Sequence, residues 1–494
     1  MIKQGGAWKA VDWSTALEYV SRGLTQIVVD HGANGIGAIG SAHSTVEELH
    51  LLAKLVRGLG SDNIDFRTRH ADFVNIDGVR WLGTSIASLS TLQRVLVVGS
   101  FLRKDHPLFA QRIRQASRKG AKVHSLNAAH DDWLMTMASQ TSVAPSDWVQ
   151  ALADIASAIG ASNSAQSPLA GNVTDEAKAI AASLASGERK AILLGNAAAQ
   201  HPQASALLAL ANWIGAQTGA SVGYLTEAAN TVGAQLVGAM PKNGGLNAGQ
   251  MLAGPALKAC VLLNVEPTLD AANAAAASAA MQAAEMVVVL TPFKSVANEF
   301  ADVMLPIAPF SETSGTFVNA EGRAQSFHGV VKPLGETRPA WKVLRVLGNL
   351  LALKGFDFET SEEVRAEALG DVTTIPSRLS NQTSASATSV AAAGGLERIA
   401  DVPIYATDSL VRRATSLQLT ADARAPFASL PSALWSQLGL NAGDKVRVSQ
   451  GAAHTVLPAR VDATLAATAV RVPAGHPDTA ALGAMFGAIT VERA

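Results

Sequence analysis

Three glycines near the N-terminus form the most suggestive chemical pattern in the sequence: Gly35, Gly37 and Gly40. Their GxGxxG spacing is found in loops whose backbone N–H groups bind the pyrophosphate of a dinucleotide at the start of a helix. We expect a strand over residues 25–30 to precede them, as that fingerprint requires. A nucleotide-binding module is therefore one candidate function.

The residues after the glycines argue against that function. Ser44 and Glu47 have the spacing of a capping box, so the helix should begin beyond Gly40. In a true fingerprint the third glycine lies within the helix. Two acidic residues follow at about the expected distance of 20 positions, but Asp62 lies in a turn and Asp65 between apolar residues. We therefore expect the glycines to form a flexible surface loop at the carboxyl edge of a sheet.

Side chains that could bind a redox metal or carry out nucleophilic chemistry are few. Cys260 is the single cysteine, so it can hold no iron–sulfur cluster, and in an apolar strand we expect a buried, inert thiol. His106 and His201 each precede a proline after a predicted strand. They are either a pair of ligand-facing imidazoles or, as we expect, polar residues ahead of helices that start near proline. No Walker A, HExxH or GxSxG sequence stands out.

The charged residues exclude some classes of partner. The chain has 39 Lys+Arg against 40 Asp+Glu and 5% aromatic residues, so neither a basic field nor a stacking surface favours nucleic acid. Arg103, Lys104 and the basic stretch 112–119 could meet a nucleotide phosphate. We favour a solvated helix face or a contact with a neighbouring subunit. No apolar run reaches the roughly 20 residues of a membrane helix and no secretory signal is evident, so we expect membrane association only through partner proteins.

Repeated strand–helix–strand units must position these residues. The predicted strands are 93–99, 121–124, 190–195, 220–225, 259–265 and 285–290, with helices starting near Pro107, Pro202 and Ala271. Near-continuous apolar strands with helical crossovers predict buried parallel sheets. Residues 373–395 are rich in Ser, Thr, Ala, Asn and Gly, which predicts a flexible linker. The short strands predicted at 445–449, 455–461 and 469–473 indicate a small β-rich C-terminal domain.

Several segments resemble the molybdopterin oxidoreductase superfamily and, more narrowly, the large iron–sulfur subunit of NADH-quinone oxidoreductase, respiratory complex I. They are the opening from Ile2, residues 44–69, Val95–Pro107, Ala301–Pro306, Glu312–Gln325 and Leu438–Val448. The resemblance implies an α/β fold of two parallel-sheet domains and a C-terminal double-psi barrel. The implied boundaries are 1–65 with 231–365 for a discontinuous first domain, 66–230 for the second, 366–400 for a linker and 401–494 for the barrel.

The resemblance also implies where a cofactor cleft would lie. Its candidate residues are Gly99, Arg103, Glu312, Thr316, Asn319 and Arg323. The run Glu312–Gln325 either lines a former cofactor cleft or, as we favour, locks two domains together. Strand-end loops should gather at the ligand edge, namely Gly32–His43, Gly99–Pro107, Gly195–Pro202 and Asn264–Asp270.

The position of the family's metal ligand falls at Ala71, which has no donor atom. A shift of one residue would offer His70 or Asp72, and a carboxylate can serve as a hard ligand. We expect no metal, and we interpret His70 as a partly exposed polar residue near a loop.

The implied function is a structural, cofactor-free part of the peripheral arm of complex I. The chain would lie on the cytoplasmic side of the membrane among other peripheral-arm subunits, in a translocase that transfers electrons from NADH to quinone. The family carries its iron–sulfur clusters in a cysteine-rich region upstream of this fold, so we expect a fragment, an internal start or a split subunit. The alternatives are a self-contained molybdopterin-dependent oxidoreductase acting on a small oxyanion or formate-like substrate, and the nucleotide-binding module.

Overall fold

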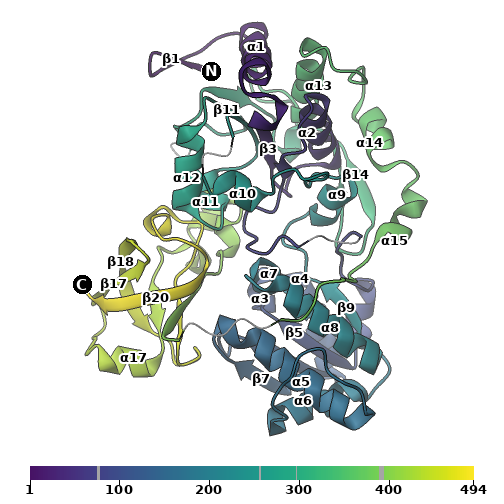
Figure 1. The fold of residues 1–494 in the computed structure, drawn as a ribbon, viewed down its shortest axis with the longest axis vertical. Coiled ribbons are helices and arrows are strands. Elements are labelled where there is room, and N and C mark those ends of the chain that lie inside the picture. Colours follow the sequence, from purple (N-terminus) through teal and green to yellow (C-terminus); the bar gives the residue numbers. More distant parts are fainter. Residues whose placement is uncertain (75–77, 255–256, 296–297, 389–393) are drawn as a thin grey trace. The chain divides into compact units, whose positions relative to one another are not determined.

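The computed structural model divides the chain into two compact units (Figure 1). It describes residues 1–74, 78–254, 257–295, 298–388 and 394–494. Unit 1 comprises Met1–Arg69, Ala228–Arg378 and Tyr405–Gln418, and unit 2 comprises His70–Glu227, Leu379–Ile404 and Leu419–Ala494. Each unit is assembled from segments that are far apart in the sequence. Within the described residues, no helix combines the length and apolar character needed to span a membrane.

Unit 1 is built on a seven-stranded sheet in the order β2-β1-β12-β11-β10-β3-β4. Its strands are β1 (Ile2–Gln4), β2 (Ala7–Lys9), β3 (Ile36–Gly40), β4 (Ile64–Asp65), β10 (Ala259–Leu263), β11 (Met286–Thr291) and β12 (Val303–Pro306). Strands β12, β11, β10, β3 and β4 run parallel, and the β1–β2 hairpin is antiparallel at one edge. Strands β3, β10 and β11 are buried along their whole length, as expected of the interior of a parallel sheet.

The other elements of unit 1 are helices and one small hairpin. The longer helices are α1 (Trp13–His31), α2 (Val46–Gly58), α12 (Ala274–Ala283), α13 (Ala340–Leu350) and α14 (Ser361–Leu369). The shorter ones are α9 (Thr231–Leu236), α10 (Ala248–Leu252), α11 (Pro267–Asp270), α15 (Ile375–Arg378) and α16 (Thr415–Gln418). The hairpin pairs β13 (Gly315–Val318) with β14 (Ala324–Phe327).

The first part of the chain corrects two predictions. Residues 25–30, predicted to be a strand, form the end of α1, where Val20, Leu24 and Ile27 are buried at helical spacing. The glycine motif is not a surface loop, because Ile36–Gly40 is the buried strand β3.

Close packing explains the glycines of β3. A Cβ atom added at Gly37 would lie 2.7 Å from Leu257 Cδ1, and one added at Gly40 would lie 2.7 Å from Leu49 Cδ2. The glycines therefore let neighbouring side chains pack directly on the strand. The capping box of α2 is formed by Thr45 and Glu48, one residue beyond the predicted pair Ser44 and Glu47.

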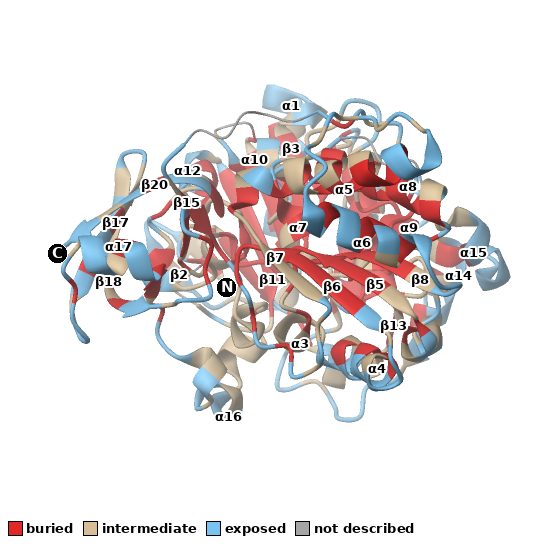
Figure 2. Ribbon diagram, turned by 90° about the horizontal axis from the view of Figure 1, so that it is seen from below, coloured by how far each residue is buried: buried red, intermediate tan, exposed pale blue. Residues whose placement is uncertain are grey.

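Unit 2 contains a five-stranded parallel sheet in the order β7-β6-β5-β8-β9. Its strands are β5 (Arg94–Val98), β6 (Lys122–Asn127), β7 (Ser139–Ser142), β8 (Lys190–Leu194) and β9 (Ser221–Tyr224). Its helices are α3 (Leu102–Asp105), α4 (Pro107–Arg118), α5 (Trp148–Asn163), α6 (Asp175–Ala185), α7 (Asn196–Gln200) and α8 (Ala204–Thr218). Figure 2 shows β5 and β6 buried, whereas α4 and α6 carry exposed faces.

Unit 2 also contains a closed six-stranded barrel in the order β15-β19-β16-β18-β17-β20. Its elements are β15 (Leu396–Ile399), β16 (Ala428–Leu430), α17 (Ser432–Gln437), β17 (Lys445–Gln450), β18 (Ala453–Val461), β19 (Ala469–Arg471) and β20 (Phe486–Arg493). Leu430, Val446, Val448 and Val470 are among the buried residues of its core. The two parallel sheets and the closed barrel confirm the predicted fold class.

The segment predicted to be a linker contains two short regular elements, and residues 380–388 between them have no regular secondary structure. It includes α15 and strand β15 of the barrel. Between them, the Asn381 amide donates hydrogen bonds to the carbonyls of Trp81 (3.0 Å) and Val222 (2.8 Å). The amino-acid composition does not reveal these contacts, because they are made mainly by polar groups, which are also common in flexible linkers. Part of the predicted linker, residues 389–393, lies outside the described residues.

Candidate functional site

The strand order of unit 1 defines a switch point on its parallel sheet. The chain forms β3, β4, β10, β11 and β12 in sequence, whereas their order in space is β4-β3-β10-β11-β12. The connections therefore reverse direction between β3 and β10. Ligands of open α/β sheets bind outside the carboxyl ends of the strands at such a point. The loops after β3 and β10 are thus the first place to look for a site.

These two loops hold each other in place. The backbone N–H of Ser41 donates to the carbonyl of Leu263 (3.0 Å), and the Asn264 amide donates to Ser44 Oγ (3.0 Å). Asn264 has a positive φ of 56°, a conformation that Asn adopts more readily than most residues. The predicted gathering of these two strand-end loops is confirmed, although the first begins only after Gly40.

Two carboxylates occupy the loop after β10. Glu266 precedes the single turn of α11 and Asp270 is its last residue, and the Glu266 N–H donates to Asp270 Oδ2 (2.8 Å). The Glu266 side chain is 1% exposed and that of Asp270 is 9% exposed. Burying two neighbouring carboxylates is strongly unfavourable unless cations neutralise them.

The segment Tyr405–Gln418, here called the strap, supplies those cations. Arg412 donates to Glu266 Oε2 (2.8 Å) and to Asp270 Oδ1 (2.9 Å), and its own side chain is 10% exposed. Arg413 forms a second ion pair with Glu266. The two carboxylates are therefore neutralised by residues of this same chain.

The strap also contacts the loops of the neighbouring strands. Arg69, after β4, donates to the Thr407 carbonyl (3.1 Å). The guanidinium of Arg413 lies 4.8 Å from the ring centroid of Phe293, after β11. His43, after β3, lies 3.9 Å from Asp408, and burial lowers the pKa of this imidazole. The strap thus contacts the loops that follow four adjacent strands of unit 1.

The predicted site segment Glu312–Gln325 forms the β13–β14 hairpin. The Thr316 hydroxyl and N–H both donate to the Glu47 carboxylate, at 2.7 and 2.8 Å, and Thr316 is 1% exposed. The Val318 N–H donates to Asn230 Oδ1 (2.8 Å). The hairpin therefore locks onto α2 and other parts of its own unit, whereas we expected a lock between domains.

The remaining candidates of the hairpin form local bonds. Glu312 accepts the Leu334 N–H (2.9 Å), and Asn319 Oδ1 accepts the N–H groups of Glu321 and Arg323 in the turn. The Arg323 side chain is exposed and lies 3.8 Å from Glu321. A role for these residues in lining a cleft stays a prediction.

The sheet of unit 2 has its own switch point, between β5 and β8. A Cβ atom at Gly99, where φ is +62°, would lie 2.5 Å from the backbone N of Ala198. A Cβ atom at Gly195 would lie 2.2 Å from Ser100 Cβ. The Ala197 N–H donates to the Gly99 carbonyl (3.0 Å). The loops after β5 and β8 therefore lie together as predicted, and they pack directly on each other.

The other chemical groups near this edge have partners in the same unit. Arg103 donates to the Asp132 carbonyl (2.7 Å). Asp105, which the sequence analysis missed, accepts the Ser100 hydroxyl (2.8 Å). Burial raises the pKa of Asp105 to about 7, and the charges of Asp401 and Asp131 act in the same direction. A buried carboxyl of this kind can hold a proton near neutral pH.

The predicted metal position also lies in unit 2, and the side chains beside it are engaged. His70 Nε2 lies 2.6 Å from Glu227, and Asp72 accepts the N–H (2.8 Å) and the hydroxyl of Ser205. Ala71 between them offers no donor atom. Among the described residues, no group of three His, Cys, Asp or Glu side chains is arranged to hold a metal.

The remaining titratable candidates also have structural partners. His201 Nε2 lies 2.9 Å from the Pro145 carbonyl, and burial lowers the pKa of its imidazole to about 4. His106 Nε2 lies 2.9 Å from the Thr226 carbonyl. Cys260 is buried as predicted, and burial raises the pKa of its thiol to about 12, which disfavours the reactive thiolate.

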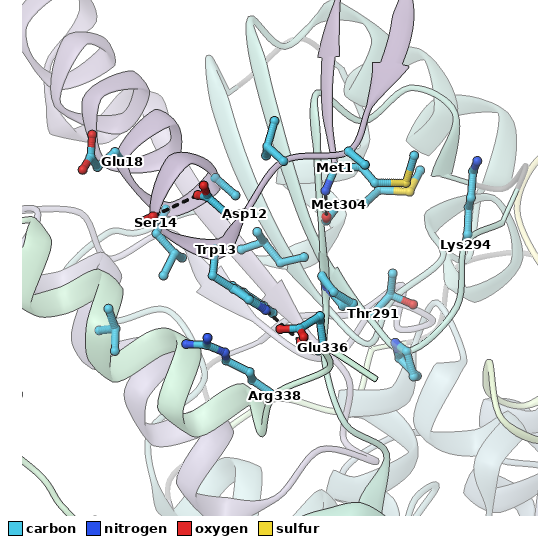
Figure 3. Close-up of a pocket in the computed structure, with 18 of the residues that line it drawn as sticks. Met1, Asp12, Trp13, Ser14, Glu18, Thr291, Lys294, Met304, Glu336 and Arg338 are labelled. Carbon is cyan, nitrogen blue, oxygen red and sulfur yellow. Dashed lines mark hydrogen bonds between the residues drawn. The ribbon is translucent and has the colours of Figure 1, made fainter. Parts of the chain in front are cut away.

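Unit 1 contains a cavity of about 830 Å³ beside the carboxyl ends of β11 and β12 (Figure 3). Figure 3 shows the Trp13 indole reaching Glu336, whose carbonyl accepts its N–H (2.7 Å). The Arg338 guanidinium lies 5.1 Å from the centroid of Trp13. Thr291 and Met304 also line the cavity, which could hold a small, largely apolar molecule. No sequence pattern indicated this cavity, because its walls come from segments that are far apart in the chain.

Known proteins resemble this chain over most of its length. The sequence profile of the molybdopterin oxidoreductase family matches residues 1–350. The probable oxidoreductase YjgC of Bacillus subtilis is 26% identical over 444 residues, which cover 74% of this chain and 44% of that protein. The alpha subunit of the NADPH-Fe(3+) oxidoreductase of Geobacter sulfurreducens is 25% identical over 404 residues, covering 69% of this chain and 48% of that subunit. A putative formate dehydrogenase of Staphylococcus aureus is 24% identical over 429 residues, covering 72% and 43%.

A solved structure supports the same fold. Acetylene hydratase from Pelobacter acetylenicus superposes with a TM-score of 0.64 at 14% sequence identity, covering 100% of this chain and 91% of that chain. The chain spans less than half the length of the three curated relatives above. The family profile nevertheless covers well over half of this sequence. The chain belongs to the molybdopterin oxidoreductase family.

Proposed function

We propose that this chain is a structural, cofactor-free portion of a larger oxidoreductase assembly of the NADH-quinone oxidoreductase type. Electrons would run from NADH to quinone through centres on other segments or subunits, on the cytoplasmic side of the membrane. The observation that carries the proposal is the strap, which contacts the strand-end loops of unit 1 where a ligand of this fold class would bind.

The residues at the switch point of unit 1 do not fit a bound pterin nucleotide. Arg412 and Arg413, which could otherwise meet phosphate, are directed at Glu266 and Asp270. A phosphate entering here would have to displace buried carboxylates from both arginines, and it would leave those carboxylates without their charge partners. The two arginines and the two carboxylates therefore already have partners within this chain.

The residues of unit 2 fit the cofactor no better. Any Cβ atom at Gly99 or Gly195 would overlap the facing loop, so the two strand-end loops already occupy the space at that switch point. At the family's metal position, Ala71 provides no ligand atom, and the side chains of His70 and Asp72 are engaged by Glu227 and Ser205.

Two further observations support a role within an assembly. The Geobacter sulfurreducens relative is by its name one subunit of an oxidoreductase, and this chain covers less than half of it. One of the segments that resemble the complex I subunit, Glu312–Gln325, forms hydrogen bonds with Glu47 and Asn230 within unit 1. A chain whose charged and polar side chains bond to one another is suited to a structural role beside neighbouring subunits.

Native purification tests this proposal. The chain would be tagged in its own host, extracted under mild conditions and separated on a native gel that is stained for NADH-driven dye reduction. We expect it to migrate with a multisubunit assembly that oxidises NADH. A chain that migrates by itself, with all of the host's NADH-oxidising assemblies free of it, would refute the proposal.

A self-contained molybdopterin-dependent oxidoreductase is the second candidate. It is favoured by the family match and by the names of the relatives, which include a putative formate dehydrogenase. Formate-dependent reduction of an artificial dye by the purified chain would establish it. Failure of formate, nitrate and related small oxyanions to support electron transfer would remove it.

A further inference from the structure

A second cavity in unit 1, of about 660 Å³, lies beside the C-terminal end of α2. Its walls come from α2, from the turn that follows α13, and from α14. Lys54, Arg57 and Lys354 line it together with a single carboxylate, Glu367. It is separate from the switch point, because α2 starts next to the β3 loop and ends at Gly58, just before β4.

Lys54 is held in a defined position on one wall. Its ammonium group lies 2.5 Å from Glu367 and within 5.4 and 5.0 Å of the ring centroids of Phe356 and Phe358. Gly355, with a positive φ of 78°, leaves room for it, since a Cβ atom there would lie 2.9 Å from Lys54 Nζ. A cation between two aromatic rings is fixed in place without being fully neutralised.

Two further cations converge on Gly238. Lys242 Nζ and Arg57 Nη1 lie 3.3 and 3.6 Å from the position that a Cβ atom of Gly238 would occupy. Arg57 also donates through Nε to Asp62 (2.7 Å) and through Nη2 to the Met240 carbonyl (2.9 Å). Arg57 lies in the last turn of α2, where the helix dipole favours a cation. The helix dipole does not explain the position of Lys242, which lies in a separate loop.

The charges around this cavity do not balance. Among the described residues that line the cavity, Lys54, Arg57 and Lys354 accompany one carboxylate, Glu367, which leaves a formal surplus of two positive charges. Lys242 and Asp62 do not line the cavity, but both lie close to Arg57. The side chains of Lys242 and Lys354 are exposed, and in the described part of the chain neither ammonium group forms a hydrogen bond or an ion pair. His50, also in the lining, does not add to the surplus at neutral pH, because burial lowers the pKa of its imidazole. Like charges held near one another repel unless an anion lies between them.

We propose that this cavity, here called the basic pocket, binds a small oxyanion with two negative charges, either inorganic phosphate or a phosphate monoester. Such a dianion matches the surplus of two positive charges and accepts charge-assisted hydrogen bonds from ammonium and guanidinium groups. The proposal is independent of the proposed function, because it concerns a different part of unit 1.

Calorimetric titration of the full chain with inorganic phosphate at low ionic strength tests the basic pocket. We expect saturable binding that weakens about tenfold or more in the double variant Lys242→Gln/Lys354→Gln, since each lysine contributes a charged hydrogen bond. Both lysines lie in loops, and folding of the variant would be checked by circular dichroism. The matched control is Lys294→Gln, an exposed lysine at the other cavity, which should bind phosphate as the unmodified chain does.

A parallel titration with glycerol phosphate distinguishes the two sources of the anion. Tighter binding of the ester assigns the site to a phosphate monoester, and equal binding assigns it to phosphate itself. Two results would overturn the proposal: no saturable heat up to about 10 mM phosphate, or equal affinity in the double variant and the unmodified chain.

Discussion

Replacing Arg412 with alanine removes the centre of the ion network beneath the strap. The Glu266 and Asp270 side chains are 1% and 9% exposed, and each would lose its contact with Arg412, at 2.8 and 2.9 Å. Removing one partner of a buried ion pair costs roughly 3–5 kcal/mol. Because Arg413 still reaches Glu266 and Arg69 still reaches Asp270, we expect a smaller loss of about 2–3 kcal/mol in the free energy that holds the strap down.

Hydrogen exchange of the strap amides is the suitable assay, because two units need not unfold in a single transition. Within the strap, the N–H groups of Arg412 and Gln418 donate to the carbonyls of Asp408 and Ala414. A loss of 2–3 kcal/mol should speed their exchange by about 30- to 150-fold, at tenfold for each 1.4 kcal/mol. Amides of β10, buried beneath the loop, should keep their exchange rates.

The control is Arg22→Ala, which breaks an exposed pair with Glu18 at 3.4 Å. Such surface pairs contribute at most about 1 kcal/mol, so strap exchange should not change. Adding Glu266→Gln to Arg412→Ala should recover part of the loss, because it removes the carboxylate left without a partner. If Arg412→Ala speeded exchange no more than the control, the account of the strap would be refuted.

Three further predictions concern other buried groups. Asp105→Asn should raise the free energy of unfolding at pH 8 but not at pH 4. The pKa of Asp105 rises from 3.8 to about 7 on folding, so the buried carboxylate destabilises the folded state increasingly as the pH rises through that interval. Removing it should therefore recover at most roughly 4 kcal/mol at pH 8. Urea unfolding at both pH values measures this, with exposed Asp132→Asn as the control, and an equal effect at both would contradict it. Thr316→Val should destabilise unit 1 by about 1–3 kcal/mol, because Glu47 is buried and loses a hydroxyl donor; an unchanged urea midpoint would show that the hairpin lock is unimportant. Cys260 should not react with a thiol reagent in the native chain but should react fully in urea, and rapid native labelling would contradict its burial.

The sequence predicted the buried parallel strands because long apolar runs determine them. Strands β5, β8, β10 and β11 lie within two residues of their predicted bounds. Predictions failed where local composition misleads. The end of α1 contains several β-branched residues, and β3 carries glycines that are poor strand formers, yet tertiary packing determines both.

The strap could not be predicted because its contacts are long-range. Arg412 and Glu266 are 146 positions apart, and nothing local to either residue indicates the pair. The sequence does contain a signal for this pair. Glu266 and Asp270 directly follow an apolar strand, and two adjacent arginines, Arg412 and Arg413, occur later in the chain. The hairpin Glu312–Gln325 was correctly singled out, but its attachment to Glu47 needed the fold.

Molybdenum, tungsten and pterin content of the native chain tests the central claim most directly. The chain would be purified anaerobically from a host that makes the molybdopterin cofactor, with a known cofactor-loaded oxidoreductase purified alongside. We expect neither metal nor pterin fluorescence above the background of the preparation, because the strap and the packed strand-end loops leave the cofactor no residues to hold it. About one metal and its pterin per chain, retained through purification, would contradict the account.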